Sequence, residues 1–209
     1  MSKPSLILIG AGGHARSCID VIEQQGQFHI AGLVGLVEQK HATQLGYSVI
    51  ASDDELPSLV NTYSYALITV GQIKSADQRI RLFQKVRQLG FEMPVIISPT
   101  AHVSRHAIID AGTIVMHGAI VNAGAKVGSN CIVNSRALVE HDTTIEDHCH
   151  IATGAILNGD VSVGAGSFIG SGSAIKQGVN IGARCLVGMG VTVRHGLSDH
   201  AHFMGHDKA

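Results

Sequence analysis

From residue 103 onward, hydrophobic residues recur at every sixth position of the chain. Sixteen successive positions of this series, from Val103 to Val193, hold Val, Ile or Leu. The position two residues before each of them holds a small or β-branched residue throughout. This period predicts a parallel β-helix, in which each hexapeptide forms one short strand and a corner, and three strands complete a triangular coil. We expect about five coils, with both repeated positions facing the core.

Residues 1–98 lack this period and alternate between apolar strands and amphipathic helices. Strands are predicted at Leu6–Ile9 and at 28–35, 47–52, 64–71 and 93–98. A first helix follows a glycine turn, with Cys18, Val21 and Ile22 on its apolar face, and a second covers about 77–89, with Ile80, Leu82 and Val86 in its stripe. The alternation predicts a small parallel α/β sheet of Rossmann type. Composition shifts at Pro99, so we expect two domains, 1–98 and 99–209.

The composition fits a repetitive β structure, with 25 glycines, no Trp and only 15% charged residues. The net charge is −1, without a basic run, so nothing indicates a nucleic-acid partner. No apolar run approaches the ~20 residues that cross a bilayer, and we expect a cytoplasmic protein without a membrane span. Cys131, Cys149 and Cys185 fall on the small inward position, which indicates buried free thiols rather than a catalytic one.

The glycine turn reads GAGGHA, from Gly10 to Ala15, and fits G-x-G-x-x-A between a strand and a helix. Such a turn directs backbone N–H groups and a helix N-terminus at a phosphate. A phosphate or nucleotide-sugar ligand is the reading we favour, and a structural tight turn is the alternative. An NAD site is disfavoured, because the second strand should end on an acid and Glu38 comes late.

A cluster of histidines and carboxylates lies within the repeat, between Ala137 and Ile156. The repeat places His141 at a corner, two residues after inward Val139, so its side chain should face outward. Gly159 follows 18 residues later, one full coil, and should stack over His141. A base and an N–H donor one coil apart suit acyl transfer. The alternatives are a solvated edge and a metal site, although a three-histidine site within one coil would need help from a neighbouring subunit.

The two halves together, GAGGHA before the hexads and EHD…HCHIATGAILNGDVSVG within them, resemble one family closely. It is the sugar acetyltransferase family of the bacillosamine, perosamine and sialic-acid enzymes. The resemblance implies a left-handed β-helix and a homotrimer with active sites between subunits. It also implies acetyl-CoA as co-substrate, no metal, and a nucleotide-sugar substrate between the N-terminal domain and the prism.

The resemblance also assigns site residues. It implies that His141 is the general base, with Asp142 as its acid, and that His150 and Gly159 contact acetyl-CoA. The other residues that it implies are Gly12, Gly13, His14 and Asn134 for the substrate, and Gly188 and Gly190 for acetyl-CoA. Two places depart from the family: Gly35 and Leu36 stand where a pair of aspartates is usual, and residues 205–209 replace a GVPAK-like tail.

The expected activity is therefore acetyl-CoA-dependent acetylation of a sugar, most favourably at the 4-amino group of a nucleotide-linked amino-deoxy sugar. One alternative is O-acetylation of a sialic acid or related sugar. An alternative of another class is a non-catalytic protein that binds nucleotide sugars on the same scaffold. Turnover of acetyl-CoA separates an enzyme from such a binding protein.

Overall fold

The N-terminal domain is built on a five-stranded sheet. The structure, a computed structural model, describes residues 2–205. The elements of this domain are β1 (Ser5–Ile9), α1 (Gly13–Gln25), β2 (His29–Gly35), β3 (Thr43–Gln44), β4 (Tyr47–Ser52), α2 (Leu56–Leu59), β5 (Tyr65–Ile68) and α3 (Asp77–Gln88), with short 3-10 turns at Val37–Gln39 and Asp53–Glu55. The strand order is β3-β4-β2-β1-β5, and only the β3–β4 pair is antiparallel. The predicted parallel sheet is confirmed, with an added hairpin at one edge.

Both faces of the central strand β1 are covered by helices. Leu6 and Leu8 pack in one cluster with the apolar face of α1, whereas Ile7 and Ile9 pack in another with residues of α3. Successive residues of a strand point to opposite faces, so a strand that is buried on both sides is apolar throughout. The carboxyl ends of the parallel strands are left free to line a site.

The buried stripe of α3 differs by one residue from the prediction. Leu82 is buried as expected, but Ile80 is half-buried and Arg79 is fully buried in the stripe. The guanidinium of Arg79 donates to the carbonyl of Val70, and to the carbonyl and side-chain oxygens of Asn130 at 2.8 and 2.7 Å. Because Asn130 belongs to the second half of the chain, Arg79 ties α3 to that half.

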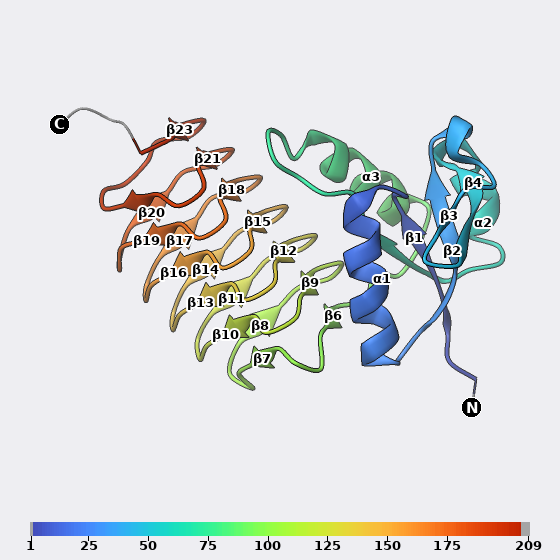
Figure 1. The fold of residues 1–209 in the computed structure, drawn as a ribbon, viewed down its shortest axis with the longest axis horizontal. Coiled ribbons are helices and arrows are strands. Elements are labelled where there is room, and N and C mark those ends of the chain that lie inside the picture. Colours follow the sequence, from blue (N-terminus) through green and yellow to red (C-terminus); the bar gives the residue numbers. More distant parts are fainter. Residues whose placement is uncertain (1, 206–209) are drawn as a thin grey trace.

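The second half is a three-sided prism of two-residue strands (Figure 1). Face 1 contains β6 (Ile96–Ile97), β9 (Ile114–Val115), β12 (Ile132–Val133), β15 (His150–Ile151), β18 (Phe168–Ile169), β21 (Leu186–Val187) and β23 (His202–Phe203). Face 2 contains β7 (His102–Val103), β10 (Ile120–Val121), β13 (Leu138–Val139), β16 (Ile156–Leu157), β19 (Ala174–Ile175) and β22 (Thr192–Val193). Face 3 contains β8 (Ile108–Ile109), β11 (Lys126–Val127), β14 (Thr144–Ile145), β17 (Ser162–Val163) and β20 (Asn180–Ile181).

The six-residue repeat sets both the core and the register of this prism. Strands stack in parallel at one coil per 18 residues, as where Val121 pairs with Val139 and Val139 with Leu157. The repeated aliphatic residues are buried from Val115 through Val193. The predicted fold class, an α/β domain followed by a left-handed parallel β-helix, is confirmed.

Between residues 112 and 190, each corner of the prism carries one residue in the left-handed backbone region. From Gly112 to Gly190, every sixth residue has φ between 54° and 77°. Glycine fills more than half of these positions, and Asp142 occupies one with φ of 61°. Aspartate tolerates this conformation better than most residues, because its short polar side chain can bond locally.

Face 1 of the prism carries the N-terminal domain. Helix α1 stands between the N-terminal sheet and this face (Figure 1). The outward residues Ile114 and Ile132 of face 1 are fully buried in a cluster with Cys18 and Ile22 of α1. Strand β6 pairs with β9, so the strand predicted at 93–98 belongs to the prism rather than to the N-terminal sheet.

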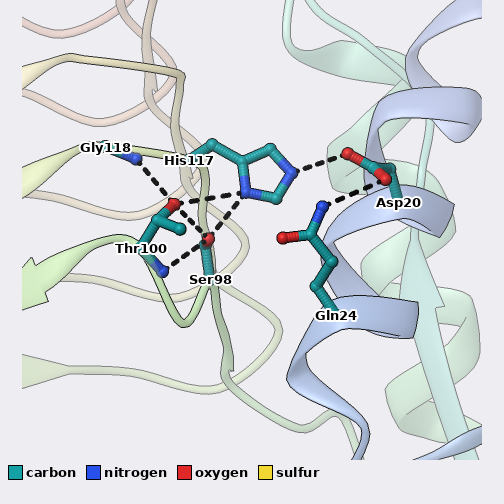
Figure 2. A network of polar contacts seen from close by, with 6 residues as sticks. All are labelled: Asp20, Gln24, Ser98, Thr100, His117 and Gly118. Atoms are coloured by element: carbon teal, nitrogen blue, oxygen red, sulfur yellow. Dashed lines mark hydrogen bonds and ion pairs between the residues drawn. The ribbon is translucent and has the colours of Figure 1, made fainter.

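A polar network also joins α1 to the first coils (Figure 2). His117 Nε2 lies 2.8 Å from a carboxylate oxygen of Asp20, and its Nδ1 lies 2.7 Å from the Ser98 hydroxyl. Thr100 adds a hydroxyl 3.0 Å from that of Ser98. The order of groups is that of a hydrolase triad, but Ser98 is only 1% exposed, so a substrate cannot reach its hydroxyl. The network therefore fixes the helix to the prism.

Within the described residues, no helix combines the length and apolarity that a membrane span requires.

Candidate active site

A cavity of about 370 Å³ opens at the carboxyl ends of the parallel strands. The glycine turn lies at its centre, and Gly12, Gly13 and His14 all line it. A Cβ atom on Gly12 or Gly13 would have no atom within 4 Å, so both glycines face open space. Helix α1 begins at Gly13 without an acidic residue in its first turn, which leaves its N-terminal N–H groups available to an anion. Three of the four residues predicted to contact substrate are thus brought together, and the fourth, Asn134, does not line this cavity.

Burial keeps the histidine of this loop, His14, neutral. Burial lowers the pKa of His14 to about 3, and the positive charge of Arg79 lowers it further. Its Nε2 atom is buried and has no hydrogen-bond partner among the described residues. A neutral imidazole can donate or accept one hydrogen bond at that nitrogen, so His14 can meet an uncharged or anionic ligand group without a change of charge.

His150 lies in the seam between the two domains. Its Nδ1 bonds the carbonyl of Gln72 at 2.8 Å, and its Nε2 lies 3.0 Å from the side-chain nitrogen of Asn134. The carbonyl can only accept and the amide nitrogen can only donate, so His150 carries its proton on Nδ1. Burial lowers the pKa of His150 to about 4. Asn134 and His150 are therefore neighbours, and both ring nitrogens of His150 are occupied within one chain. The predicted contact of His150 with acetyl-CoA stays a prediction.

His141 and Asp142 form an exposed pair at the corner between faces 2 and 3. Nδ1 of His141 lies 2.9 Å from a carboxylate oxygen of Asp142, and the two side chains are 55% and 67% exposed. The left-handed turn at Asp142 brings its carboxylate back beside the imidazole. This hydrogen bond raises the pKa of His141, aided by the nearby negative charges. Glu140 is engaged elsewhere, because it accepts from the His141 backbone N–H and from Asn122.

Gly159 lies directly against the free nitrogen of that imidazole. An added Cβ on Gly159 would stand 2.6 Å from His141 Nε2, closer than real atoms approach. The coil hydrogen bond from Asp160 N–H to the His141 carbonyl, at 3.0 Å, holds the two corners in register. The Gly159 N–H has no acceptor in the part of the chain that the structure describes. The predicted stacking of Gly159 and His141 is observed.

The base candidate and the cavity do not meet within one chain. The N-terminal domain covers face 1, whereas His141 stands on the opposite corner, where faces 2 and 3 meet. Gly190 lines a separate opening near the last coils, about 530 Å³ in volume, together with Met189, Thr192 and Arg194. Gly188 packs near Met204 beside it. Within one chain, these groups therefore lie apart from one another.

The three histidines of one coil are dispersed rather than convergent. His148 packs edge-on to Phe83 with ring centroids 5.3 Å apart, and its Nδ1 lies 3.0 Å from the Asn130 amide. Burial lowers the pKa of His148. Among residues 2–205, no group of three or more His, Cys, Asp or Glu side chains is placed to hold a metal ion.

Known proteins match both halves of the chain. The PglD N-terminal domain family matches residues 5–86, and the bacterial transferase hexapeptide family (six repeats) matches residues 142–177. An H141N variant of perosamine N-acetyltransferase from Caulobacter crescentus, in complex with CoA and GDP-perosamine, is 32% identical, with a TM-score of 0.89 over 96% of this chain and 93% of that one. The acetyltransferase domain of PglB from Neisseria gonorrhoeae, with acetyl coenzyme A, is 30% identical, with a TM-score of 0.88 over 96% of each chain. No curated protein matches the sequence.

The chain belongs to this family of sugar acetyltransferases. Its suspected membership is thereby confirmed along nearly the whole length. The two departures from the family pattern have different outcomes. Gly35 and Leu36 do line the cavity, but neither offers a side-chain carboxylate. Of the unusual tail at 205–209, residues 206–209 lie outside the described residues.

Several residues that line the cavity were not predicted from the sequence. Gln39, Asp53 and Thr69 line the cavity, and each lies in the loop that follows a parallel strand. That position is the signal that could have found them, because ligands of open α/β sheets bind at the carboxyl ends of strands. Gln72 and Arg79 carry no such signal, since their roles depend on contacts between the two domains.

Proposed function

We propose that this protein transfers the acetyl group of acetyl-CoA to the 4-amino group of a nucleotide-linked amino-deoxy sugar. The observation that carries the proposal is the His141–Asp142 pair, whose free Nε2 stands over Gly159 in a chain of this family. The relative from Caulobacter crescentus was solved with CoA and GDP-perosamine, and the one from Neisseria gonorrhoeae with acetyl coenzyme A. A glycine-lined cavity in the same chain supplies a place for the phosphates.

In the proposed reaction, the sugar amine attacks the thioester carbonyl carbon. His141 Nε2 takes the proton that the nitrogen loses, because Nδ1 is already held by Asp142. The Asp142 carboxylate stabilises the imidazolium that forms. The Gly159 N–H, free of other partners among the described residues, donates to the oxyanion of the tetrahedral intermediate. Cleavage of the C–S bond then releases the CoA thiolate, which takes up a proton, and leaves an amide.

Transfer is direct, without an acetyl-cysteine. All four cysteines are free and buried. Burial raises the pKa of Cys18 to about 12 and raises the pKa of Cys149 and of Cys185 as well. A buried thiol with a raised pKa supplies almost no thiolate at neutral pH.

The catalytic site lies between subunits of a homotrimer. Two features support this arrangement: His141 and the cavity sit on opposite sides of one chain, and face 2 exposes apolar residues that lack a cover. Ile120 and Ile156 project from face 2 with 38% and 37% exposure, whereas the equivalent residues of face 1 are buried under α1. Apolar stripes of this kind favour subunit contacts. We expect the protein in the cytoplasm, where acetyl-CoA is available.

Mixed trimers test the shared site. His141→Ala removes the base but leaves the cavity intact. Gly13→Glu places a carboxylate in the cavity, where no atom lies within 4 Å of the added Cβ, and repels phosphate without disturbing the core. Each variant alone should be nearly inactive.

Co-expression in equal amounts should restore about one quarter of wild-type turnover, because each mixed ring contains one interface with an intact cavity and an intact His141. If the co-expressed mixture turns over no faster than the single variants, the cavity and the base of one active site belong to the same subunit. An O-acetylated product, or binding of nucleotide sugar without release of free CoA, would contradict the proposed reaction itself.

A further inference from the structure

The cavity has an end that the glycine loop does not reach. Gly35 of β2 pairs in register with Ser52 of β4, so Leu36 and Asp53 follow side by side as the two strands end. Asp53 lines the cavity, and the neighbouring Asp54 does not. No described residue donates a hydrogen bond to the Asp53 carboxylate. The nearby Lys85 ammonium donates to the Asp53 backbone carbonyl, at 2.7 Å. Burial raises the pKa of Asp53. This carboxylate is therefore an acceptor without a donor.

A fixed amide lies at the same end. The side-chain oxygen of Gln39 accepts the Leu36 N–H at 3.0 Å. It stands 2.7 Å from the place of a Cβ on Gly35, so a larger residue at 35 would displace it. The oxygen thus accepts one hydrogen bond, and the NH₂ group donates none to residues 2–205. Gln39 contributes a pair of oriented donors to a cavity that already holds an unsatisfied acceptor.

The strand order fixes which part of a ligand meets this end. From one edge of the cavity to the other, the loops follow β4, β2, β1 and β5. The phosphate-binding glycine turn follows β1, in the middle. The loop after β5 reaches the prism, because the Gln72 side chain bonds the Gly166 carbonyl at 3.1 Å. A nucleotide sugar whose sugar points to the prism therefore places its base against Leu36, Gln39 and Asp53.

We propose that Asp53 and Gln39 read the base of the nucleotide sugar, and that this base is guanine. The inference rests on the proposed function. The Watson–Crick edge of guanine presents two adjacent donors, N1–H and N2–H, which match the two oxygens of one carboxylate, and one acceptor, O6, which matches the Gln39 amide. Uracil presents one N–H between two carbonyls, so a carboxylate there gains one bond and meets two repulsive oxygens. Adenine and cytosine each offer one donor beside an acceptor nitrogen.

Calorimetric titration of the full-length protein with GDP, UDP, ADP and CDP tests the assignment. GDP should bind at least about 10-fold more tightly than each of the others, the discrimination expected of one bidentate pair. Asp53→Asn should weaken GDP binding by about 10- to 100-fold and abolish the preference over UDP. Asp54→Asn, an exposed neighbour outside the cavity, is the matched control and should bind GDP as the wild type does. Thermal unfolding checks that both variants are folded.

Equal or tighter binding of another diphosphate by the wild type, or a GDP preference that survives in Asp53→Asn, overturns the assignment. Acetylation assays separate that outcome from failure of the proposed function. If a UDP-linked amino sugar is acetylated with the higher kcat/KM, the function stands and the guanine assignment is wrong. If no diphosphate binds and no nucleotide-linked amino sugar is acetylated, both are wrong.

Discussion

Replacing Gly159 by Ala should disable the base without unfolding the protein. The added Cβ would lie 2.6 Å from His141 Nε2 and 2.7 Å from Cε1, whereas ordinary contacts begin at 3.4 Å. The imidazole therefore has to move by about 0.8 Å or rotate away. A misplacement of about 1 Å at a reacting group costs on the order of 10²-fold. We expect kcat to fall by about 10- to 100-fold, which corresponds to ~1.4–2.7 kcal/mol in the barrier.

Stability should hardly change in this variant. Gly159 is outside the left-handed region that the corner residues occupy, so alanine adopts its backbone conformation without strain. The side chain of His141 is 55% exposed and can move into solvent. A Gly→Ala change at a compatible site alters the free energy of unfolding by only about 0.4–1 kcal/mol, in the stabilising direction. Urea unfolding measures this, and stopped assays of free CoA measure kcat.

A double-mutant cycle shows whether the effect acts through His141. Because the Gly159→Ala variant retains the backbone N–H at this position, the substitution should cost nothing further in a protein that already carries His141→Ala. A Gly159→Ala enzyme with wild-type kcat would refute the reasoning. So would a 10-fold loss that persists in the His141→Ala background, since the methyl group would then be acting on the substrates.

Three further predictions follow from the charges and contacts described. Asp142→Asn removes the hydrogen bond that raises the pKa of His141, so the acid limb of kcat/KM should move to lower pH, and an unmoved limb would show that another group titrates. His150 is neutral in the fold, with a pKa of about 4, and takes up a proton more readily when unfolded. His150 alone should therefore lower the free energy of unfolding by up to about 3 kcal/mol between pH 6.5 and 4, beside a similar loss from His14, and His150→Gln should remove the share of His150 in urea titrations at each pH. Arg79→Met leaves the Val70 carbonyl and the Asn130 oxygens buried without their donor, and should lower the free energy of unfolding by about 2–5 kcal/mol, whereas a loss below about 1 kcal/mol would mean that water replaces the guanidinium.

The prism could be predicted from sequence because the six-residue repeat determines both the core positions and the stacking of the coils. A period of six fixes which residues face inward, and the same period fixes that residues 18 apart stack. This period alone predicts that Gly159 stacks over His141. The return of Asp142 toward His141 did not follow, because residue spacing does not show that the corner takes a left-handed turn, with φ of 61° at Asp142.

Contacts between the domains lay beyond sequence reasoning. Arg79 is a charged residue that is buried, and the sequence gives no sign of this because its partner, Asn130, lies 51 residues away. The sequence also gives no sign that the Gln72 carbonyl and Asn134 lie against the ring nitrogens of His150. The six-residue period of the prism carries no information about which residues of the N-terminal domain pack against it.

Acetylation of a nucleotide-linked amino-deoxy sugar by wild type and His141→Ala tests the central claim most directly. Mass spectrometry of the product and release of free CoA should be measured together across pH 5 to 9. The account predicts one N-acetyl group per molecule of CoA released by the wild type, and a kcat lowered by about 10²–10⁴-fold in His141→Ala. It also predicts that the wild-type rate rises through a limb near the His141 pKa, and that this limb is missing in the variant. A His141→Ala enzyme that retains near-normal kcat and the same pH dependence would contradict the account.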